Sequence, residues 1–168
     1  MKTFVKITKI ILNIIITTII IIGIAFIGLF CFGIQPYVVE SGSMQPTIET
    51  GSVCFINKKA DYNKMQVGDI IAFKINTGAS ATHRITAITE DGFETKGDAN
   101  NSVDNVITTQ ENFIGKNLFS IPKIGFLVRS IQTPSGKIVL VTIILTIFLA
   151  GILIGEPSKK KRKKKEIE

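Results

Sequence analysis

The sequence predicts a small, mainly β, antiparallel domain flanked by two transmembrane helices. Three observations favour this fold class. Two apolar runs of membrane length lie near the two ends of the 168-residue chain. The segment between them consists of short β-type runs separated by turn residues, and no part of it has a convincing helical period. A chain of this length has room for one small domain and its membrane anchors.

The first anchor is predicted at residues 10–34. Its apolar run, residues 10–32, exceeds the roughly 20 residues that a helix needs to cross a bilayer. A cleavable signal peptide is the alternative, and it would require an apolar stretch of roughly 7–15 residues followed by small residues at a cleavage site. The run is longer than that, and residues 29–33 (Leu-Phe-Cys-Phe-Gly) offer no such site. An uncleaved anchor is therefore favoured.

The second anchor is predicted at residues 137–155, at the short end of the spanning range. The apolar segment 121–128 ahead of it is too short to cross a membrane. It is predicted to lie at the membrane interface, with a buried loop as the alternative. Residues 133–136 (Thr-Pro-Ser-Gly) are expected to break the chain before the second anchor begins.

The positive charge lies beside these anchors. The formal net charge is +7, and it comes from Lys2, Lys6 and Lys9 together with the lysine-rich tail after Pro157. Residues 35–137 contain as many acidic as basic residues. The basic pI therefore indicates membrane flanks rather than a surface for nucleic acid, and the tail is expected to touch anionic lipid.

The positive-inside rule then predicts the topology of a cell-membrane protein with two spans. Both termini are expected in the cytoplasm: residues 1–9 precede the first anchor, and residues 156–168 follow the second. Residues 35–136 are expected to form an extracytoplasmic domain between the anchors at 10–34 and 137–155.

Six short strands are predicted within that domain, because its apolar runs are rich in β-branched and aromatic residues and are bounded by Gly, Asn and Asp. Residues 84–89 alternate between apolar and polar side chains, as a half-buried strand does. Residues 90–92 (Glu-Asp-Gly) are expected to form a hairpin turn. The predicted strands are residues 37–40, 52–57, 70–75, 81–89, 93–96 and 113–119.

The candidate catalytic residues follow the first anchor. Ser43 lies in the sequence Ser-Gly-Ser-Met-Gln-Pro-Thr, and His83 is the only histidine of the chain. A serine hydroxyl becomes a competent nucleophile only when a base takes its proton, and histidine is the residue type suited to that task near neutral pH. The imidazole in turn needs an acceptor to hold its second nitrogen. Asp98 and Asp104 are both candidates for that acceptor, and the sequence leaves the choice open.

Four stretches of the domain carry a family resemblance, and together they cover most of it. The chain resembles type I signal peptidases, in particular the endoplasmic-reticulum-type subfamily also found in archaea and some Gram-positive spore formers. The common bacterial form has a lysine as general base where this chain has His83. The matching stretches are residues 41–47, 68–73, 82–84 and 96–104.

The resemblance implies a folded-over β-barrel and a serine endopeptidase that removes signal peptides from exported preproteins after small residues. It implies Ser43 as nucleophile, His83 as general base and Asp104 as third member of the triad. The Ser43 backbone N–H and the Ser41 hydroxyl are expected to form the oxyanion hole. Asp98 is expected to hold its loop through backbone hydrogen bonds.

No cofactor or metal is expected, because Cys31 and Cys54 lie far apart in sequence and the chain lacks a cysteine–histidine cluster. The expected partners are secretory preproteins, the lipid bilayer and the membrane translocation machinery. Met44, beside the nucleophile, is expected to line a shallow apolar pocket or to touch lipid.

Two other functions are considered. One is a membrane serine protease dedicated to one or a few secreted proteins. The other is a catalytically silent, membrane-anchored β-domain that binds exported proteins. The presence of Ser43, His83 and Asp104 together argues against the silent domain.

Overall fold

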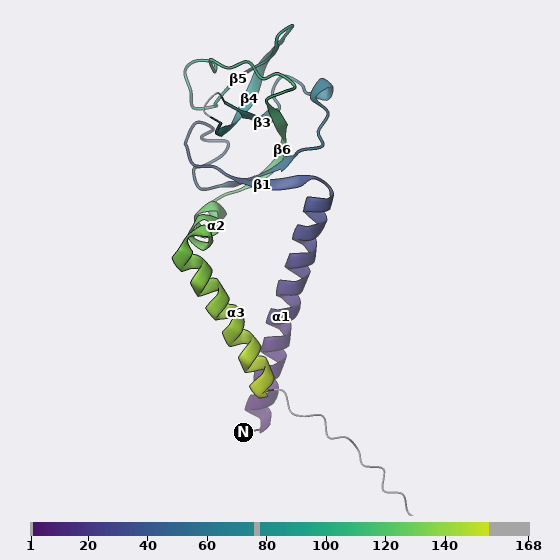
Figure 1. Cartoon of the computed structure of the whole chain (residues 1–168), viewed down its shortest axis with the longest axis vertical. Helices are drawn as coiled ribbons and strands as arrows, with labels where there is room; N and C mark the ends of the chain where they lie inside the picture. The colour runs from purple at the N-terminus through teal and green to yellow at the C-terminus, as the bar shows by residue number, and fades with distance from the viewer. Residues whose placement is uncertain (1, 76–77, 155–168) are drawn as a thin grey trace, which may run out of the picture.

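The computed structural model describes residues 2–75 and 78–154. A long N-terminal helix leads into a β domain, and two further helices follow it (Figure 1). The predicted tail at residues 156–168 lies outside the described residues. The elements are α1 (Lys2–Cys31), β1 (Ile34–Val38), β2 (Val53–Asn57), the 3-10 helix η1 (Tyr62–Lys64), β3 (Ile70–Lys74), β4 (Ser80–Thr89), β5 (Gly92–Lys96), β6 (Phe113–Ile121), α2 (Ile124–Gln132) and α3 (Pro134–Ile154).

Helix α1 contains residues 10–31 of the first predicted anchor. Its segment Lys6–Cys31 is long and apolar enough to cross a membrane. The helix begins before the predicted residue 10. It also ends before the predicted residue 34, because Gly33 has a φ of 82° and turns the chain directly into β1. Lys59 donates from Nζ to the carbonyl of Cys31 at 2.9 Å. A cation is favourable there, since the C-terminus of a helix carries partial negative charge.

Helices α2 and α3 are joined by a bend of 94° at Thr133. The break was predicted at residues 133–136, but it consists of Thr133 alone. Pro134 already begins α3, since proline fits the first turn of a helix. Among the described residues α1 is long and apolar enough to cross a membrane by itself, whereas α2 and α3 are so only when taken together as one bent pair. The second span at residues 137–155 stays a prediction, as does the interfacial position of segment 121–128.

The six predicted strands form one antiparallel sheet in the order β1-β2-β6-β3-β4-β5. The prediction of a mainly β, antiparallel domain is confirmed. In this order β1 and β5 are the edge strands, and closure into a barrel stays a prediction. The hairpin between β4 and β5 lies where it was expected, and Gly92 has a φ of 137° there. A Cβ atom on Gly92 would come within 2.5 Å of the Thr108 carbonyl oxygen.

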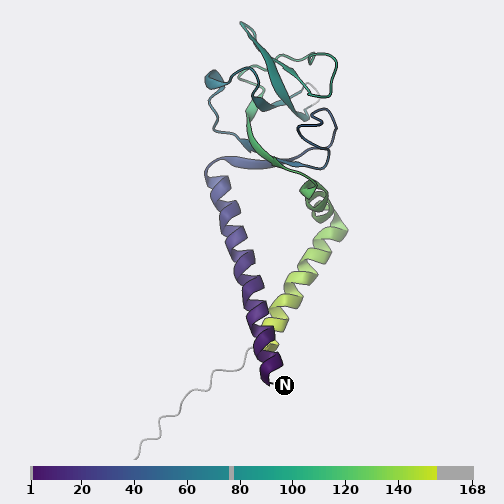
Figure 2. The same ribbon diagram turned by 180° about the vertical axis from the view of Figure 1, so that it is seen from behind.

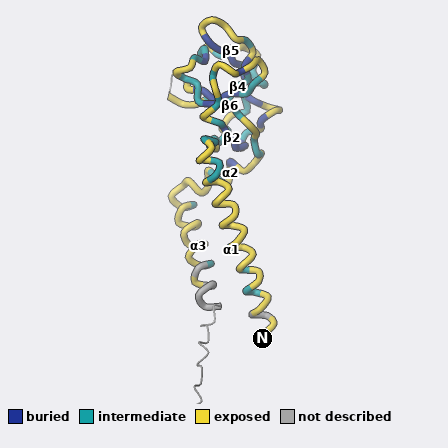
Figure 3. The backbone as a smooth tube through the Cα atoms, turned by 90° about the vertical axis from the view of Figure 1, so that its right-hand side faces the viewer, coloured by how far each residue is buried: buried dark blue, intermediate teal, exposed yellow. Residues whose placement is uncertain are grey.

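The described core lies in the β domain, whereas α1 and α3 are largely exposed (Figure 3). One cluster of buried side chains lies beneath the loop that carries Ser43, and it contains Met44, which is 1% exposed. Met44 therefore packs into the core, and it also lines the cleft at Ser43; of the two expected roles, the structure favours the pocket over contact with lipid. The two clusters consist of Met44, Ile48, Cys54, Ile56 and Ala72, and of Met65, Ile71, Phe73, Ile85 and Phe93.

Helix α2 packs against the loop that precedes β2. The Gly125 N–H donates to the carbonyl of Gly51 at 2.8 Å. The Phe126 ring lies against Gly51, which has no side chain to obstruct it. Helices α1 and α3 leave the same side of the domain and approach each other at their ends remote from it (Figure 1 and Figure 2).

Replacing Gly125 by alanine should destabilise the domain. The added Cβ would come within 2.6 Å of the Gly51 carbonyl oxygen, a backbone atom that cannot rotate away. Overpacking of this kind costs about 1–3 kcal/mol, against the roughly 1 kcal/mol that alanine gains over glycine in a helix. Thermal unfolding in detergent measures the difference. Gly28→Ala is the control, because its Cβ would meet no atom within 4 Å; equal melting temperatures for both variants would contradict the tight contact.

Candidate active site

Ser43 lies in a loop between β1 and β2 that is held at several points. The next residue, Met44, is buried, and the Ile48 N–H donates to the Met44 carbonyl at 2.8 Å. The Ser43 carbonyl accepts a hydrogen bond from the Ala99 N–H at 2.8 Å. The side chain of Ser43 is therefore carried by a backbone fixed both to the core and to the loop around residue 99.

His83 lies on β4, where it is paired with Ile71 of β3. Its Nε2 is 3.0 Å from Ser43 Oγ, within hydrogen-bonding distance. The imidazole also meets the ring of Phe73 edge-on, at 6.1 Å between centroids. The His83 side chain is only 12% exposed, so its orientation is fixed by these contacts and by its carboxylate partner.

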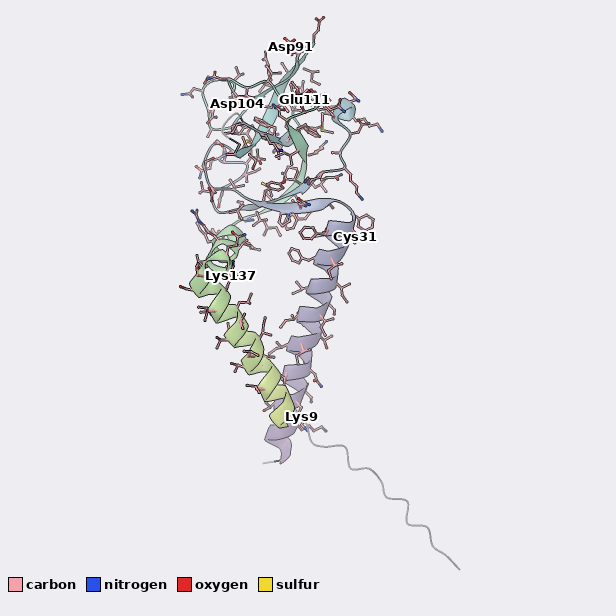
Figure 4. All side chains as sticks on the ribbon, viewed as in Figure 1. Lys9, Cys31, Asp91, Asp104, Glu111 and Lys137 are labelled. Atoms are coloured by element: carbon pink, nitrogen blue, oxygen red, sulfur yellow. The ribbon has the colours of Figure 1, made fainter. Side chains whose placement is uncertain are left out.

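Asp104 is that partner. Its Oδ2 lies 2.7 Å from His83 Nδ1. The same oxygen accepts a hydrogen bond from the Thr95 hydroxyl at 2.6 Å, and the Asp104 N–H donates to the Thr95 carbonyl at 2.8 Å. Asp104 lies within the β domain (Figure 4), where its side chain is 17% exposed. Of the two aspartates that the sequence left open, the structure brings Asp104 to the imidazole.

Asp98 has a different partner. The Arg84 guanidinium donates two hydrogen bonds to its carboxylate, at 2.9 and 2.7 Å, and also donates to the Gly68 carbonyl at 2.8 Å. The Arg84 hydrogen bonds lower the pKa of the Asp98 carboxyl; burial opposes this effect, and a hydrogen bond from Thr47 and the charge of Lys96 add to it. These partners of the Asp98 carboxylate are side chains, whereas hydrogen bonds to the backbone were expected. Asp98 ties the Ser43 loop to β4.

Ser41 lies beside the reactive hydroxyl. Its Oγ is 3.1 Å from Ser43 Oγ, and either atom can donate. A donor next to the attacking oxygen is also next to the carbonyl that this oxygen would attack. The hydroxyl of Ser41 and the backbone N–H of Ser43 are the two groups predicted to stabilise an oxyanion.

A cleft of about 600 Å³ opens at Ser43 and His83. One wall consists of residues 37–40, which end β1 and continue it, and the other consists of residues 79–83 around the start of β4. Small side chains, Ala79 and Ala81 among them, line the second wall. The cleft can therefore hold a narrow, extended chain alongside the serine.

The buried cysteine does not compete with Ser43 as a nucleophile. Cys54 is fully buried among apolar side chains, and burial raises the pKa of its thiol to about 11. The thiol is therefore protonated at neutral pH, and a thiolate is the form that reacts.

Two residues at the site were not identified from the sequence. Arg84 follows His83 directly, and neighbouring residues of a strand point to opposite faces, which was a signal for a separate role. Thr95 is fully buried on β5. A threonine in a strand is ordinary, so the sequence carried no signal for its bond to Asp104.

A serine, an imidazole and a carboxylate in this chain of hydrogen bonds match the geometry of the serine hydrolases. The family model described as "Signal peptidase, peptidase S26" matches residues 11–116. This is more than half of the chain and includes Ser43, His83 and Asp104. The chain belongs to the peptidase S26 signal peptidase family.

The chain is also similar to Signal peptidase I W of Bacillus subtilis (strain 168). The two are 39% identical over 85 residues, which are 48% of this chain and 45% of that protein. The matched region is thus about half the length of either protein. Helices α2 and α3 lie beyond the end of the family match at residue 116.

Asp98→Asn should lower stability in a pH-dependent manner. The pKa of Asp98 is lower in the folded protein than its ordinary value of 3.8. Its carboxylate therefore stabilises the fold fully above that value, and the contribution is lost as the pH falls through the folded pKa. At pH 7 the variant should lose about 1–3 kcal/mol, and the difference from the unsubstituted protein should shrink below about pH 4.

Melting temperatures in detergent between pH 3 and pH 7 test this. Asp61→Asn is the matched control. Asp61 pairs with Lys64 at 3.7 Å on an exposed surface, and asparagine can replace it as the cap of η1. A pH-independent loss in Asp98→Asn would mean that the charge of Asp98 does not stabilise the fold.

Proposed function

We propose that this protein is a membrane-bound serine endopeptidase that removes N-terminal signal peptides from exported preproteins after small residues. The observation that carries the proposal is the hydrogen-bonded series Ser43–His83–Asp104, with distances of 3.0 and 2.7 Å, in a chain of the signal peptidase family. The reaction is proposed to run through an acyl-enzyme.

The proton moves between Ser43, His83 and the leaving group, and Asp104 does not take it up. The imidazole of His83 takes the Ser43 proton at Nε2 as Oγ attacks the scissile carbonyl, and it returns the proton to the leaving amine. Asp104 holds the Nδ1–H, which leaves Nε2 free to accept, and stabilises the imidazolium that forms. Water then attacks the acyl-enzyme, with His83 acting again as base.

Charge on the substrate oxygen is proposed to be stabilised by the Ser43 backbone N–H and the Ser41 hydroxyl. The proximity of Ser41 Oγ to Ser43 Oγ, 3.1 Å, supports the second donor. Removing one such donor costs about 10²–10³ in rate in comparable enzymes.

The substrate is proposed to bind as an extended segment between residues 37–40 and 79–83. Both segments end or begin strands, so their backbone groups can pair with a peptide. The small side chains on one wall suit a preprotein with small residues before its cleavage site. Glu40 is the charged residue among those that line the cleft.

The site is proposed to act on the extracytoplasmic surface of the cell membrane. Lys9 lies on α1 remote from the domain, and Cys31 lies at the end next to it (Figure 4). Lysines at the remote end favour a cytoplasmic N-terminus. Helix α3 is proposed as a second span that returns the chain to the cytoplasm. Secretory preproteins, the bilayer and the translocation machinery are the proposed partners.

A protease dedicated to a few secreted proteins would use the same residues, so substrate range distinguishes it from a general signal peptidase. A silent binding domain would not react with a serine-directed inhibitor. Covalent labelling of Ser43 by an acylating or phosphonylating reagent separates catalysis from binding alone.

Ser43→Ala and His83→Ala should each abolish cleavage of a purified preprotein, while the proteins still insert and fold. Loss of a triad member costs on the order of 10⁴–10⁶ in rate in a comparable hydrolase. Asp104→Ala should also lose most activity, whereas Asp98→Ala should act mainly through instability. Ser102→Ala is the control, since Ser102 is exposed and lies in the same loop as Asp104. Folded, active His83→Ala protein would refute the proposed mechanism.

Protease added to intact, wall-stripped cells should digest residues 35–136 and spare a tag placed after Glu168. The expected result follows from the lysines outside both predicted spans, which favour a cytoplasmic location for both termini. Immunoblotting for the tag measures it, and permeabilised cells provide the control. Loss of the tag from intact cells would mean that α3 does not cross the membrane.

A further inference from the structure

We infer that Thr95 is a positioning residue of the Ser43–His83–Asp104 site, which holds the Asp104 carboxylate in the orientation that His83 requires. This inference rests on the proposed function of that site. Thr95 Oγ1 donates to Asp104 Oδ2 at 2.6 Å, and His83 Nδ1 meets the same oxygen at 2.7 Å. One carboxylate oxygen is thus held by two groups.

The bond from Thr95 cannot be exchanged for a bond to water. Thr95 is 0% exposed, and a buried hydroxyl without a partner loses its hydration with no compensation. The hydroxyl therefore keeps the carboxylate oxygen as its acceptor. A short bond from a hydroxyl to a carboxylate is also among the stronger hydrogen bonds in proteins.

The backbone adds a second attachment. The Asp104 N–H donates to the Thr95 carbonyl at 2.8 Å, so the main chain and the side chain of Asp104 are both held by one residue. Thr95 in turn is paired with Ile85 of β4. Because Ile85 is two residues from His83, both side chains lie on one face of that strand. The acceptor and the imidazole are thus attached to the same pair of strands.

This attachment has a chemical consequence. The Nδ1–H tautomer of His83 leaves Nε2 free to take the Ser43 proton, and a fixed acceptor at Nδ1 selects that tautomer. The hydrogen bond from the Thr95 hydroxyl also stabilises the negative charge of the Asp104 carboxylate. Without this donor the carboxylate attracts a proton more strongly, so the protonated imidazole is favoured and the acid limb of activity moves to higher pH.

Thr95→Val and Thr95→Ser separate the hydroxyl from the shape of the side chain. Valine keeps the branched shape and removes the donor, whereas serine keeps the donor and removes a methyl group. Thr108→Val is a matched control, because Thr108 is also 0% exposed and its Oγ1 has no partner among the described residues.

Cleavage of a purified preprotein by the full-length protein in detergent is the first measurement. We expect Thr95→Val to lower kcat about ten- to a hundredfold, the loss of one hydrogen bond to a charged group, with KM little changed. The acid limb of kcat/KM should move to higher pH. Thr95→Ser and Thr108→Val should retain most activity and an unshifted profile. Equal kcat for Thr95→Val and the unsubstituted protein, or an equal loss in Thr95→Ser, would overturn the inference.

Nuclear magnetic resonance provides a readout that needs no substrate. His83 is the only histidine in the chain, so labelling with ¹⁵N-histidine yields one imidazole to titrate. The pH midpoint of this signal should rise in Thr95→Val but not in Thr95→Ser or Thr108→Val. An unchanged midpoint in Thr95→Val would overturn the inference.

The two measurements also distinguish the inference from the proposed function. If the unsubstituted protein cleaves no preprotein and Ser43 reacts with no acylating reagent, the proposed function fails, and the imidazole titration alone decides the role of Thr95. If Thr95→Val does not fold, Thr95→Cys replaces it, because a thiol of similar size is a weak donor. The same shift is expected from it, and its absence counts against Thr95.

Discussion

The candidate site depends on the contact between the Ser43 loop and the loop at residues 97–104. The Ala99 N–H donates to the Ser43 carbonyl at 2.8 Å, and a Cβ on Gly97 would come within 2.5 Å of that same oxygen. A side chain at Gly97 would therefore push the loops apart. Because Asp104 and Ser43 are on opposite sides of the His83 ring, such a displacement would lengthen the series of hydrogen bonds. The distance between these loops thus controls the geometry of the whole site.

Most of the fold could be predicted because the domain consists of short strands separated by strong turn residues, and local pattern determines such elements. The first strand is predicted at residues 37–40, whereas β1 begins at Ile34 and includes Gln35 and Pro36, residue types that are not typical of strands. Gly33 was the available signal, because its positive φ ends the helix. Helix α2 was not recognised as a helix. Its packing on Gly51 joins residues far apart in the chain, and local pattern does not report such contacts.

The candidate site was predictable to the extent that residue type determines chemistry. Ser43 and the single histidine could be identified from residue type, whereas the choice between Asp98 and Asp104 depended on which carboxylate meets His83 and which meets its neighbour on β4, Arg84. The two expected roles of Met44 could not be separated from the sequence, because an apolar residue beside a nucleophile fits a lipid surface as well as a pocket. The burial of Met44 depends on the cluster beneath the loop, which strands distant in sequence assemble. The role inferred for Thr95 rests on its hydrogen bonds to Asp104, which composition and spacing do not reveal.

We propose that Asp98 serves stability and Asp104 serves chemistry, and their different partners support this division. Arg84 is charged at every physiological pH, so its bond to Asp98 is the same throughout a reaction and can only hold the loops together. Asp104 instead faces an imidazole and a hydroxyl, neither of which carries a permanent charge. Its interaction with His83 strengthens when the imidazole gains a proton, which is the condition for stabilising a transition state rather than a ground state. Exchanging the partners of Asp98 and Asp104 would remove that difference, since a permanent cation beside the triad carboxylate would compete with the imidazolium for its charge.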